Sequence, residues 1–94
     1  MGKSRDILNL MSKKYSYKML KGLEEGPKRF KDLSYACSGE KMRAQRLREF
    51  EDFKLLNVNL ERMGRRAVSV YELSDAGRSI LRLAEEIKKV NKKG

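Results

Sequence analysis

The spacing of apolar residues over the first thirty positions predicts two short helices followed by an extended segment. Apolar side chains recur every three or four positions over residues 4–13 and again over residues 15–24, which is the period of one helical face. Ser4 can cap the first of these helices, and Gly26 can end the second. A Gly-Pro pair at this point breaks helical structure, so we expect residues 27–30 to be extended.

Helical spacing returns twice in the middle of the chain. A short helix is predicted over residues 31–36, and a longer one runs from residue 39 to about residue 56. Ser38 lies between them and is a favourable N-cap for the longer helix. The two predicted helices are therefore separated by only a short turn.

Beyond the longer helix the apolar period changes from helical to strand-like. Residues 57–61 alternate between polar and apolar side chains, and residues 67–73 are rich in β-branched and aromatic side chains. A glycine-containing turn between them predicts a β-hairpin. Ser74 is suited to cap a final helix, predicted over residues 75–91, whose apolar side chains follow helical spacing.

The order of these elements, α-α-β-α-α-β-β-α, predicts a mainly α fold with a small β-hairpin (α+β). Two helices across a short turn, followed by a β-hairpin, form a winged helix-turn-helix in which the hairpin is the wing. We therefore predict one winged helix-turn-helix domain over residues 1–94. The helix from residue 39 is its recognition helix.

The charge of the chain indicates a polyanionic partner. Lys and Arg number 23 against 13 Asp and Glu among 94 residues, so the formal net charge is +10. Such an excess favours nucleic acid first and an anionic membrane surface second. No apolar run approaches the length of a membrane span, and no apolar signal segment follows the amino terminus. We expect a cytoplasmic, nucleoid-associated protein with no membrane partner.

The residues that most enzymes need are missing. The sequence has no histidine and one cysteine, Cys37, and it lacks the glycine-rich loops that bind nucleotide phosphates. A histidine-based catalytic pair, an imidazole or thiolate metal site and an intrachain disulfide are thereby excluded. We expect a binding protein without cofactor or metal rather than an enzyme, and Cys37 as a small buried residue.

One face of the longer helix carries side chains suited to DNA bases. Lys41, Gln45, Arg48 and Asp52 follow one another at helical spacing, opposite an apolar face centred on Leu47. Arg and Lys pair with guanine and Gln pairs with adenine, so we expect Lys41, Gln45 and Arg48 to contact base edges. The alternative is the ordinary solvated face of an amphipathic helix.

The charges of this helix are ordered along its length. Its first half is mainly basic and its second half mainly acidic, and the amino-terminal half of a recognition helix is the half that enters the major groove. This order opposes the helix dipole, so helix stability does not explain it. We expect Ser38, Arg43 and Arg46 to contact the DNA backbone beside the bases.

Two further groups of residues lie where a winged helix would meet the DNA backbone. Arg62, Arg65 and Arg66 flank the predicted hairpin turn and would reach the minor groove or adjacent phosphates from the wing. The alternative is a charged hairpin tip that keeps a strand edge soluble. Phosphate contacts are also expected from the segment around the first helix of the motif: Lys28, Arg29, Lys31, Ser34 and Tyr35.

Three segments of the chain share motifs with a known regulator family. They are residues 26–33 (GPKRFKDL), residues 47–52 (LREFED) with Leu55, and residues 71–78 (YELSDAGR). They resemble, in turn, the opening of the DNA-binding unit, the exit of the recognition helix and the start of the last helix in HxlR-type winged-helix transcriptional regulators, relatives of the MarR group. The resemblance covers about residues 15–85 and implies a DNA-binding regulator.

The chain departs from that family at three places. The family usually has an apolar residue where Arg43 lies and a glycine where Lys54 lies. Many members also have a cysteine near the amino terminus, which this chain lacks. The resemblance therefore does not imply thiol sensing.

The two outer helices carry more apolar side chains than a small domain easily covers from within. The resemblance implies that the helices at residues 4–13 and 75–91 pair across a two-fold axis; the alternative is a monomer that folds them onto its own core. A C2 dimer would hold two recognition helices about 34 Å apart, one turn of DNA. The expected interface residues are Ile7, Leu10, Met11, Ile80, Leu83, Ala84, Ile87 and Val90.

These features predict a homodimeric transcriptional regulator that binds double-stranded DNA sequence-specifically at a pseudo-palindromic operator. One alternative is a winged-helix protein-interaction module in a transcription or processing assembly. Another is an RNA-binding basic protein, although the sequence has no RNP-type strand. The sequence identifies no small-molecule effector.

Overall fold

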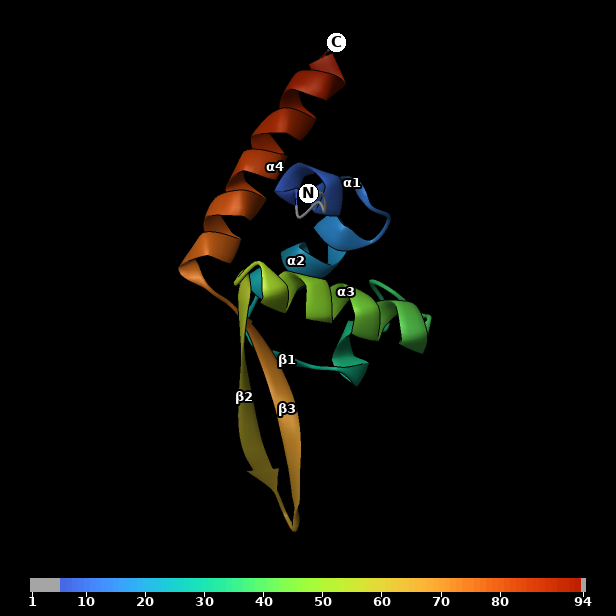
Figure 1. The fold of residues 1–94 in the computed structure, drawn as a ribbon, viewed down its shortest axis with the longest axis vertical. Coiled ribbons are helices and arrows are strands. Elements are labelled where there is room, and N and C mark those ends of the chain that lie inside the picture. Colours follow the sequence, from blue (N-terminus) through green and yellow to red (C-terminus); the bar gives the residue numbers. More distant parts are fainter. Residues whose placement is uncertain (1–5, 94) are drawn as a thin grey trace.

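The structure, a computed structural model, describes residues 6–93 and shows four α-helices, one 3₁₀ turn and a three-stranded antiparallel sheet over that range. The helices gather at one end, and two long strands extend away from them as a hairpin (Figure 1). This arrangement confirms the predicted α+β winged helix-turn-helix. In chain order the elements are α1 (Ile7–Ser12), α2 (Ser16–Glu24), β1 (Lys28–Arg29), η1 (Lys31–Leu33), α3 (Glu40–Asp52), β2 (Leu56–Met63), β3 (Arg66–Leu73) and α4 (Asp75–Lys93).

Polar side chains fix the ends of the two short helices that open the fold. Asp6 caps α1, because its carboxylate accepts a hydrogen bond from the Leu8 amide at 3.0 Å. The cap predicted at Ser4 lies outside the described residues. The buried Ser16 hydroxyl donates to the Leu10 carbonyl at 2.8 Å, so the corner between α1 and α2 is held although α1 has only six residues.

The helix-turn-helix differs from the prediction in its first helix and in the cap of its second. Instead of a helix over residues 31–36, the chain forms the three-residue 3₁₀ turn η1 and then further turns. α3 begins after Gly39 with no side-chain cap, so the predicted Ser38 cap is wrong. The backbone between η1 and α3 therefore has few helical hydrogen bonds of its own.

α3 ends at Asp52, before the predicted end near residue 56, in a Schellman motif. The Lys54 amide donates to the Glu51 carbonyl and the Leu55 amide to the Phe50 carbonyl, each at 2.9 Å. Lys54 has φ of 61°, a left-handed conformation that favours glycine. The departure from the HxlR pattern at this position therefore places a lysine in a conformation suited to glycine.

The wing is an antiparallel hairpin that β1 supports only at its base. β2 and β3 pair along their whole length, from Leu56 opposite Leu73 to Met63 opposite Arg66. Gly64 has φ of 68° and holds the first central position of a two-residue turn, where a type II′ turn favours glycine. β1 reaches only the part of β3 near the body, so the rest of the hairpin projects from it (Figure 1).

The start of α4 packs closely against the exit of α3. The Ser74 hydroxyl accepts a hydrogen bond from the Gly77 amide at 3.0 Å, which confirms the predicted cap, and it donates to the Lys54 carbonyl at 2.7 Å. A Cβ atom at Gly77 would overlap the Leu55 carbonyl oxygen. Glycine is therefore required where α4 crosses this backbone.

The hydrophobic core lies where α2, α3 and α4 meet the base of the sheet. Its fully buried side chains include Met19 of α2, Phe50 of α3 and Leu81 of α4. Cys37 is 1% exposed and belongs to this core, as predicted. Among residues 6–93, no helix is long and apolar enough to span a bilayer.

Candidate nucleic-acid interface

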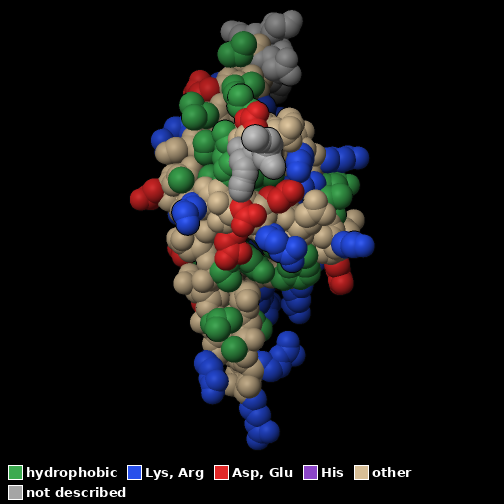
Figure 2. Space-filling model, in the orientation of Figure 1, with side chains coloured by type: hydrophobic (Ala, Val, Ile, Leu, Met, Phe, Trp, Pro, Cys, Tyr) green, Lys and Arg blue, Asp and Glu red, His purple; other side chains and the backbone are tan. Residues whose placement is uncertain are grey.

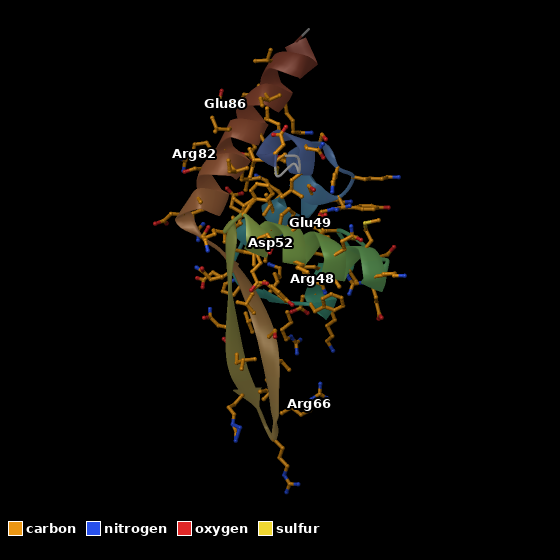
Figure 3. The ribbon with its side chains drawn as sticks, in the orientation of Figure 1. Arg48, Glu49, Asp52, Arg66, Arg82 and Glu86 are labelled. Atoms are coloured by element: carbon orange, nitrogen blue, oxygen red, sulfur yellow. The ribbon has the colours of Figure 1, made fainter. Side chains whose placement is uncertain are left out.

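α3 has an exposed polar face opposite the side that packs into the core. Lys41, Gln45, Arg48 and Asp52 are all exposed, whereas Leu47 is buried, which confirms the predicted division of the helix into two faces. Figure 3 marks Arg48 and Asp52 along the helix. Within residues 6–93, the side chains of Lys41, Gln45 and Arg48 make no hydrogen bond or ion pair, so their donors are free.

Arg43 is buried, and its donors face the protein. The residue is only 3% exposed to solvent. Its Nε donates to the Cys37 carbonyl at 2.8 Å, its Nη2 to the Ser38 carbonyl at 2.9 Å and its Nη1 to the Phe30 carbonyl at 3.4 Å. The phosphate contact predicted for Arg43 is therefore wrong, because backbone carbonyls occupy its guanidinium.

Arg46 is also buried, at 4% exposed, and its predicted phosphate contact is wrong because its guanidinium is engaged by side chains of α3. Its Nη1 donates to Glu49 Oε1 at 2.6 Å, and its Nη2 lies 2.9 Å from Met42 Sδ. Glu49 also accepts a hydrogen bond from Lys13 Nζ at 3.1 Å, which connects α3 to the end of α1. Burial opposes the charge of Glu49, but the hydrogen bonds from Arg46 and Lys13 outweigh it and lower the pKa of this carboxyl below its usual range.

The wing carries exposed arginines around its turn. Arg62, Arg65 and Arg66 are exposed, and in the part of the chain that the structure describes none of them has an ion-pair partner. Figure 2 shows basic side chains gathered at the end of the wing, and Figure 3 labels Arg66 there. The predicted place of these arginines at the hairpin tip is confirmed, and their contact with DNA stays a prediction.

A basic groove of about 360 Å³ lies between the wing and the segment that leads into η1. Its lining includes the cationic side chains of Arg29, Lys31 and Arg66 and the hydroxyl-bearing Ser69 and Tyr71. The sequence interpretation missed the two hydroxyl residues. Their spacing of two along a predicted strand was the available signal, because alternate residues of a strand share one face.

The basic residues of the segment from β1 to η1 differ in how far they are engaged within the protein. Lys28 pairs with Glu25 at 3.4 Å, and Arg29 pairs with Asp32 at 3.2 Å. The backbone amide of Arg29 and then its guanidinium lower the pKa of the Asp32 carboxyl below its usual range. Lys31 is exposed and has no partner among the described residues, so it is the member of this group most available to an anion.

The polar residues after η1 are exposed, as their predicted role requires. Ser34, Tyr35 and Ser38 all lie on the surface. The Tyr35 hydroxyl lies against α2 at Gly22, where a Cβ atom would overlap it. Tyr35 is still 55% exposed.

A second candidate surface is an apolar groove of about 280 Å³ between α1 and α4, at the end of the molecule away from the wing (Figure 1). One acidic residue, Glu86, lies at its rim (Figure 3). The apolar residues that line the groove are Ile7, Leu8, Met11, Ile80, Leu83, Ala84 and Ile87.

Six of the eight predicted interface residues line this groove, whereas Val90 is exposed outside its lining and Leu10 is buried. Leu83, Ile87 and Val90 are 58%, 59% and 71% exposed, whereas Leu10 is 3% exposed and belongs to the core. The interface role predicted for Leu10 is therefore wrong, because the side chain points inward from α1. Leu8, which the prediction left out, is 67% exposed on the same helix.

The family of the chain follows from comparison with known proteins. A profile of the HxlR-like helix-turn-helix family matches residues 10–93. The chain belongs to this family. The HxlR-like protein is thus a DNA-binding transcription regulator, and regulators of this kind are generally not enzymes. A search of curated proteins found no match.

Solved structures similar to the HxlR-like protein share its winged-helix fold. Diamide-treated YodB from B. subtilis has a TM-score of 0.82 at 22% identity, covering 93% of this chain and 87% of that chain. The redox regulator HypR in its reduced form has a TM-score of 0.78 at 19% identity, covering 93% and 87%. The HTH-type protein ytcD has a TM-score of 0.75 at 26% identity and covers both chains completely.

Proposed function

We propose that the HxlR-like protein binds double-stranded DNA sequence-specifically, with the amino-terminal part of α3 in the major groove. The observation that carries this proposal is the row formed by Lys41, Gln45 and Arg48, which is exposed and free of partners within residues 6–93. Free lysine, glutamine and arginine donors match the acceptors that guanine and adenine present in that groove. Asp52 lies farther along the same face, away from the groove.

The DNA backbone would be held by the wing and the basic groove beside it. Arg62, Arg65 and Arg66 supply unpaired cations at the wing, and Lys31 supplies another at the start of η1. The partly engaged Lys28 and Arg29, together with the exposed polar side chains of Ser34, Tyr35 and Ser38, would support these phosphate contacts. Phosphate contacts of this kind position a protein on DNA, whereas base contacts specify the sequence.

We further propose that the protein acts as a homodimer paired through the α1–α4 groove. A second copy fits this surface because its lining is almost entirely apolar and includes the exposed side chains of Leu83 and Ile87. A two-fold axis there would bring two wings and two recognition helices to one side of a duplex. The matching site is a pseudo-palindrome with half-sites about 34 Å apart.

The proposal is tested by selecting bound duplexes from a random pool and measuring affinity for the selected site against salt concentration. We expect a symmetric consensus. If each protomer neutralises about four phosphates, the slope of log K against log salt is about −7. A Lys41→Ala/Arg48→Ala double variant should lose most of its preference for the selected site over a scrambled duplex, about a hundredfold.

A matched control is Arg82→Ala, which removes an exposed arginine of α4 outside the proposed surfaces. This variant should keep both the preference and the slope. The proposal would be wrong if affinity did not depend on salt, or if the double variant kept the full preference of the wild-type chain. Selection without any consensus would favour a protein-interaction module instead.

A further inference from the structure

The most unusual side chain in the helix-turn-helix is Arg43, which is both charged and almost completely buried. Its guanidinium makes hydrogen bonds to three backbone carbonyls, those of Phe30, Cys37 and Ser38. It also lies 4.5 Å from the centroid of the Phe30 ring. One side chain of α3 thus contacts both the entry to η1 and the turn that follows it.

The turn needs these hydrogen bonds because its own backbone supplies too few. η1 is a 3₁₀ turn of three residues, and no regular helix covers residues 34–39. Among the described residues, no backbone amide donates to the Cys37 or Ser38 carbonyl. A buried carbonyl without a partner is costly, and a hydrogen bond from an ionised guanidinium is stronger than one between neutral groups.

The location of Arg43 connects this turn to the residues proposed to contact DNA bases. Arg43 lies in the first turns of α3, two residues after Lys41 and two before Gln45. Both neighbours are exposed, while Arg43 points into the protein. Any shift of the turn relative to α3 would therefore move the exposed face of the helix relative to η1.

We propose that Arg43 is a positioning residue for DNA recognition: its guanidinium holds the turn to the recognition helix and so fixes how Lys41 and Gln45 meet the bases, without touching DNA. The inference rests on the proposed function. It differs from the rejected phosphate contact in what it predicts, because a phosphate contact changes the salt dependence of binding and a positioning contact does not.

The test uses the full chain with Arg43→Met. This substitution removes the guanidinium and leaves an apolar side chain of similar length. Affinity is measured for the selected duplex and for a scrambled duplex at several salt concentrations. We expect affinity for the selected duplex to fall about tenfold and affinity for the scrambled duplex to change by less than about twofold, because base contacts alone are misaligned. The salt slope should stay unchanged.

Two arginine-to-methionine variants serve as matched controls. Arg65→Met at the wing turn removes one phosphate contact from each protomer of the dimer, so it should reduce the magnitude of the salt slope by about two and leave the preference between the two duplexes nearly unchanged. Arg82→Met on α4 should change neither. Arg43→Lys should regain part of the preference, since one ammonium reaches fewer carbonyls than the planar guanidinium.

A variant at a second residue distinguishes a loss of positioning from a loss of folding. Phe30→Leu removes the ring beneath the guanidinium and leaves all its hydrogen-bond acceptors, so we expect the same pattern in weaker form. Circular dichroism and thermal unfolding show that each variant is folded at the temperature of the binding assay. If Arg43→Met, Arg43→Lys and Phe30→Leu were all unfolded there, Arg43 would be a stabilising residue only and the inference would be overturned.

The remaining outcomes separate this inference from the proposed function. A folded Arg43→Met variant with an unchanged preference would overturn the positioning role alone. A shallower salt slope for that variant would also overturn it and restore a phosphate contact. If the wild-type chain selected no consensus, the proposed function would fail first and the inference with it.

Discussion

At the scale of single residues, three arginines of α3 have three different environments. Arg43 is buried against backbone carbonyls, Arg46 is buried against the Glu49 carboxylate, and Arg48 is exposed without a partner among the described residues. They have the same chemistry and lie within six positions of one another. The role of each is therefore set by the direction in which the helix points it, and charge alone is a poor guide to DNA contact.

Lys54 gives a residue-scale prediction, because it holds a left-handed conformation at the end of α3. Lys54→Gly should raise the free energy of unfolding by about 1 kcal/mol, since glycine adopts positive φ without the steric cost that a side chain meets. Urea denaturation at neutral pH measures the change. Lys54→Ala keeps a Cβ atom and should give little gain; a gain equal to that of glycine would contradict the argument from φ.

At the scale of elements, α3 is held at its start and at its middle by polar contacts as well as by the core. Its start is connected to the turn through Arg43, and its middle is connected to the end of α1 through Arg46, Glu49 and Lys13. Glu49 accepts hydrogen bonds from the other two residues, so its charge holds this junction together. The junction lies between the recognition helix and one of the helices proposed to form the dimer.

Glu49→Gln should therefore destabilise the protein at neutral pH by about 2 kcal/mol, because it weakens two charge-assisted hydrogen bonds and leaves Arg46 buried beside a neutral group. The pKa of Glu49 is lowered in the folded protein from an ordinary value of 4.5. Its contribution is therefore fully present above pH 4.5 and is lost as the pH falls through the folded pKa.

Urea denaturation at pH 7 and across the acid range tests this expectation. The stability difference between wild type and Glu49→Gln should be constant above about pH 5 and shrink below pH 4.5. Glu51→Gln, an exposed change on the same helix, is the control and should have little effect at either pH. A Glu49→Gln difference that did not depend on pH would count against a role for the Glu49 charge.

At the scale of the whole molecule, the two candidate surfaces lie at different ends of an elongated body. The protein measures 51 × 33 × 26 Å, with the wing at one end and the α1–α4 groove toward the other (Figure 1). Dimerisation through the groove would leave α3 and the wing of each copy uncovered. The shape therefore allows one chain to pair with a second copy and with DNA at the same time.

Replacing the exposed apolar residues of α4 should separate the dimer without unfolding it. Leu83→Glu/Ile87→Glu places two charges on side chains that are 58% and 59% exposed in the single chain, so the fold should persist while the apolar pairing is lost. Sedimentation should show a monomer. Affinity for the selected palindrome should fall at least about a hundredfold, because two linked half-sites no longer bind together.

The control is Arg82→Glu, which changes an exposed residue in the same part of α4. This variant should remain a dimer. An isolated half-site should bind the double variant and the wild-type protomer about equally. If the double variant stayed dimeric, the partner copy would have to pair through another surface.

Much of the fold was predictable because it depends on local geometry. The helical and strand periods, the Ser74 cap and the glycine at the hairpin turn involve residues close together in sequence. The first helix of the motif was mispredicted as residues 31–36; the structure has a 3₁₀ turn there, and carbonyls on either side of it accept hydrogen bonds from Arg43, which lies beyond it in the chain. The hydroxyl residues of the basic groove were missed because strand and η1 meet only in three dimensions.

The order of elements, the basic character of the chain and the exposed face of α3 could be predicted without a structure, because each follows from helical or strand geometry and from the count of charges. The inward direction of Arg43 and Arg46, and the exposure of Leu8 rather than Leu10, became visible only in the folded chain. The physical reason is that the inward direction of a short helix is set by what packs against it. A buried guanidinium is acceptable only where carbonyls or carboxylates are positioned to meet it.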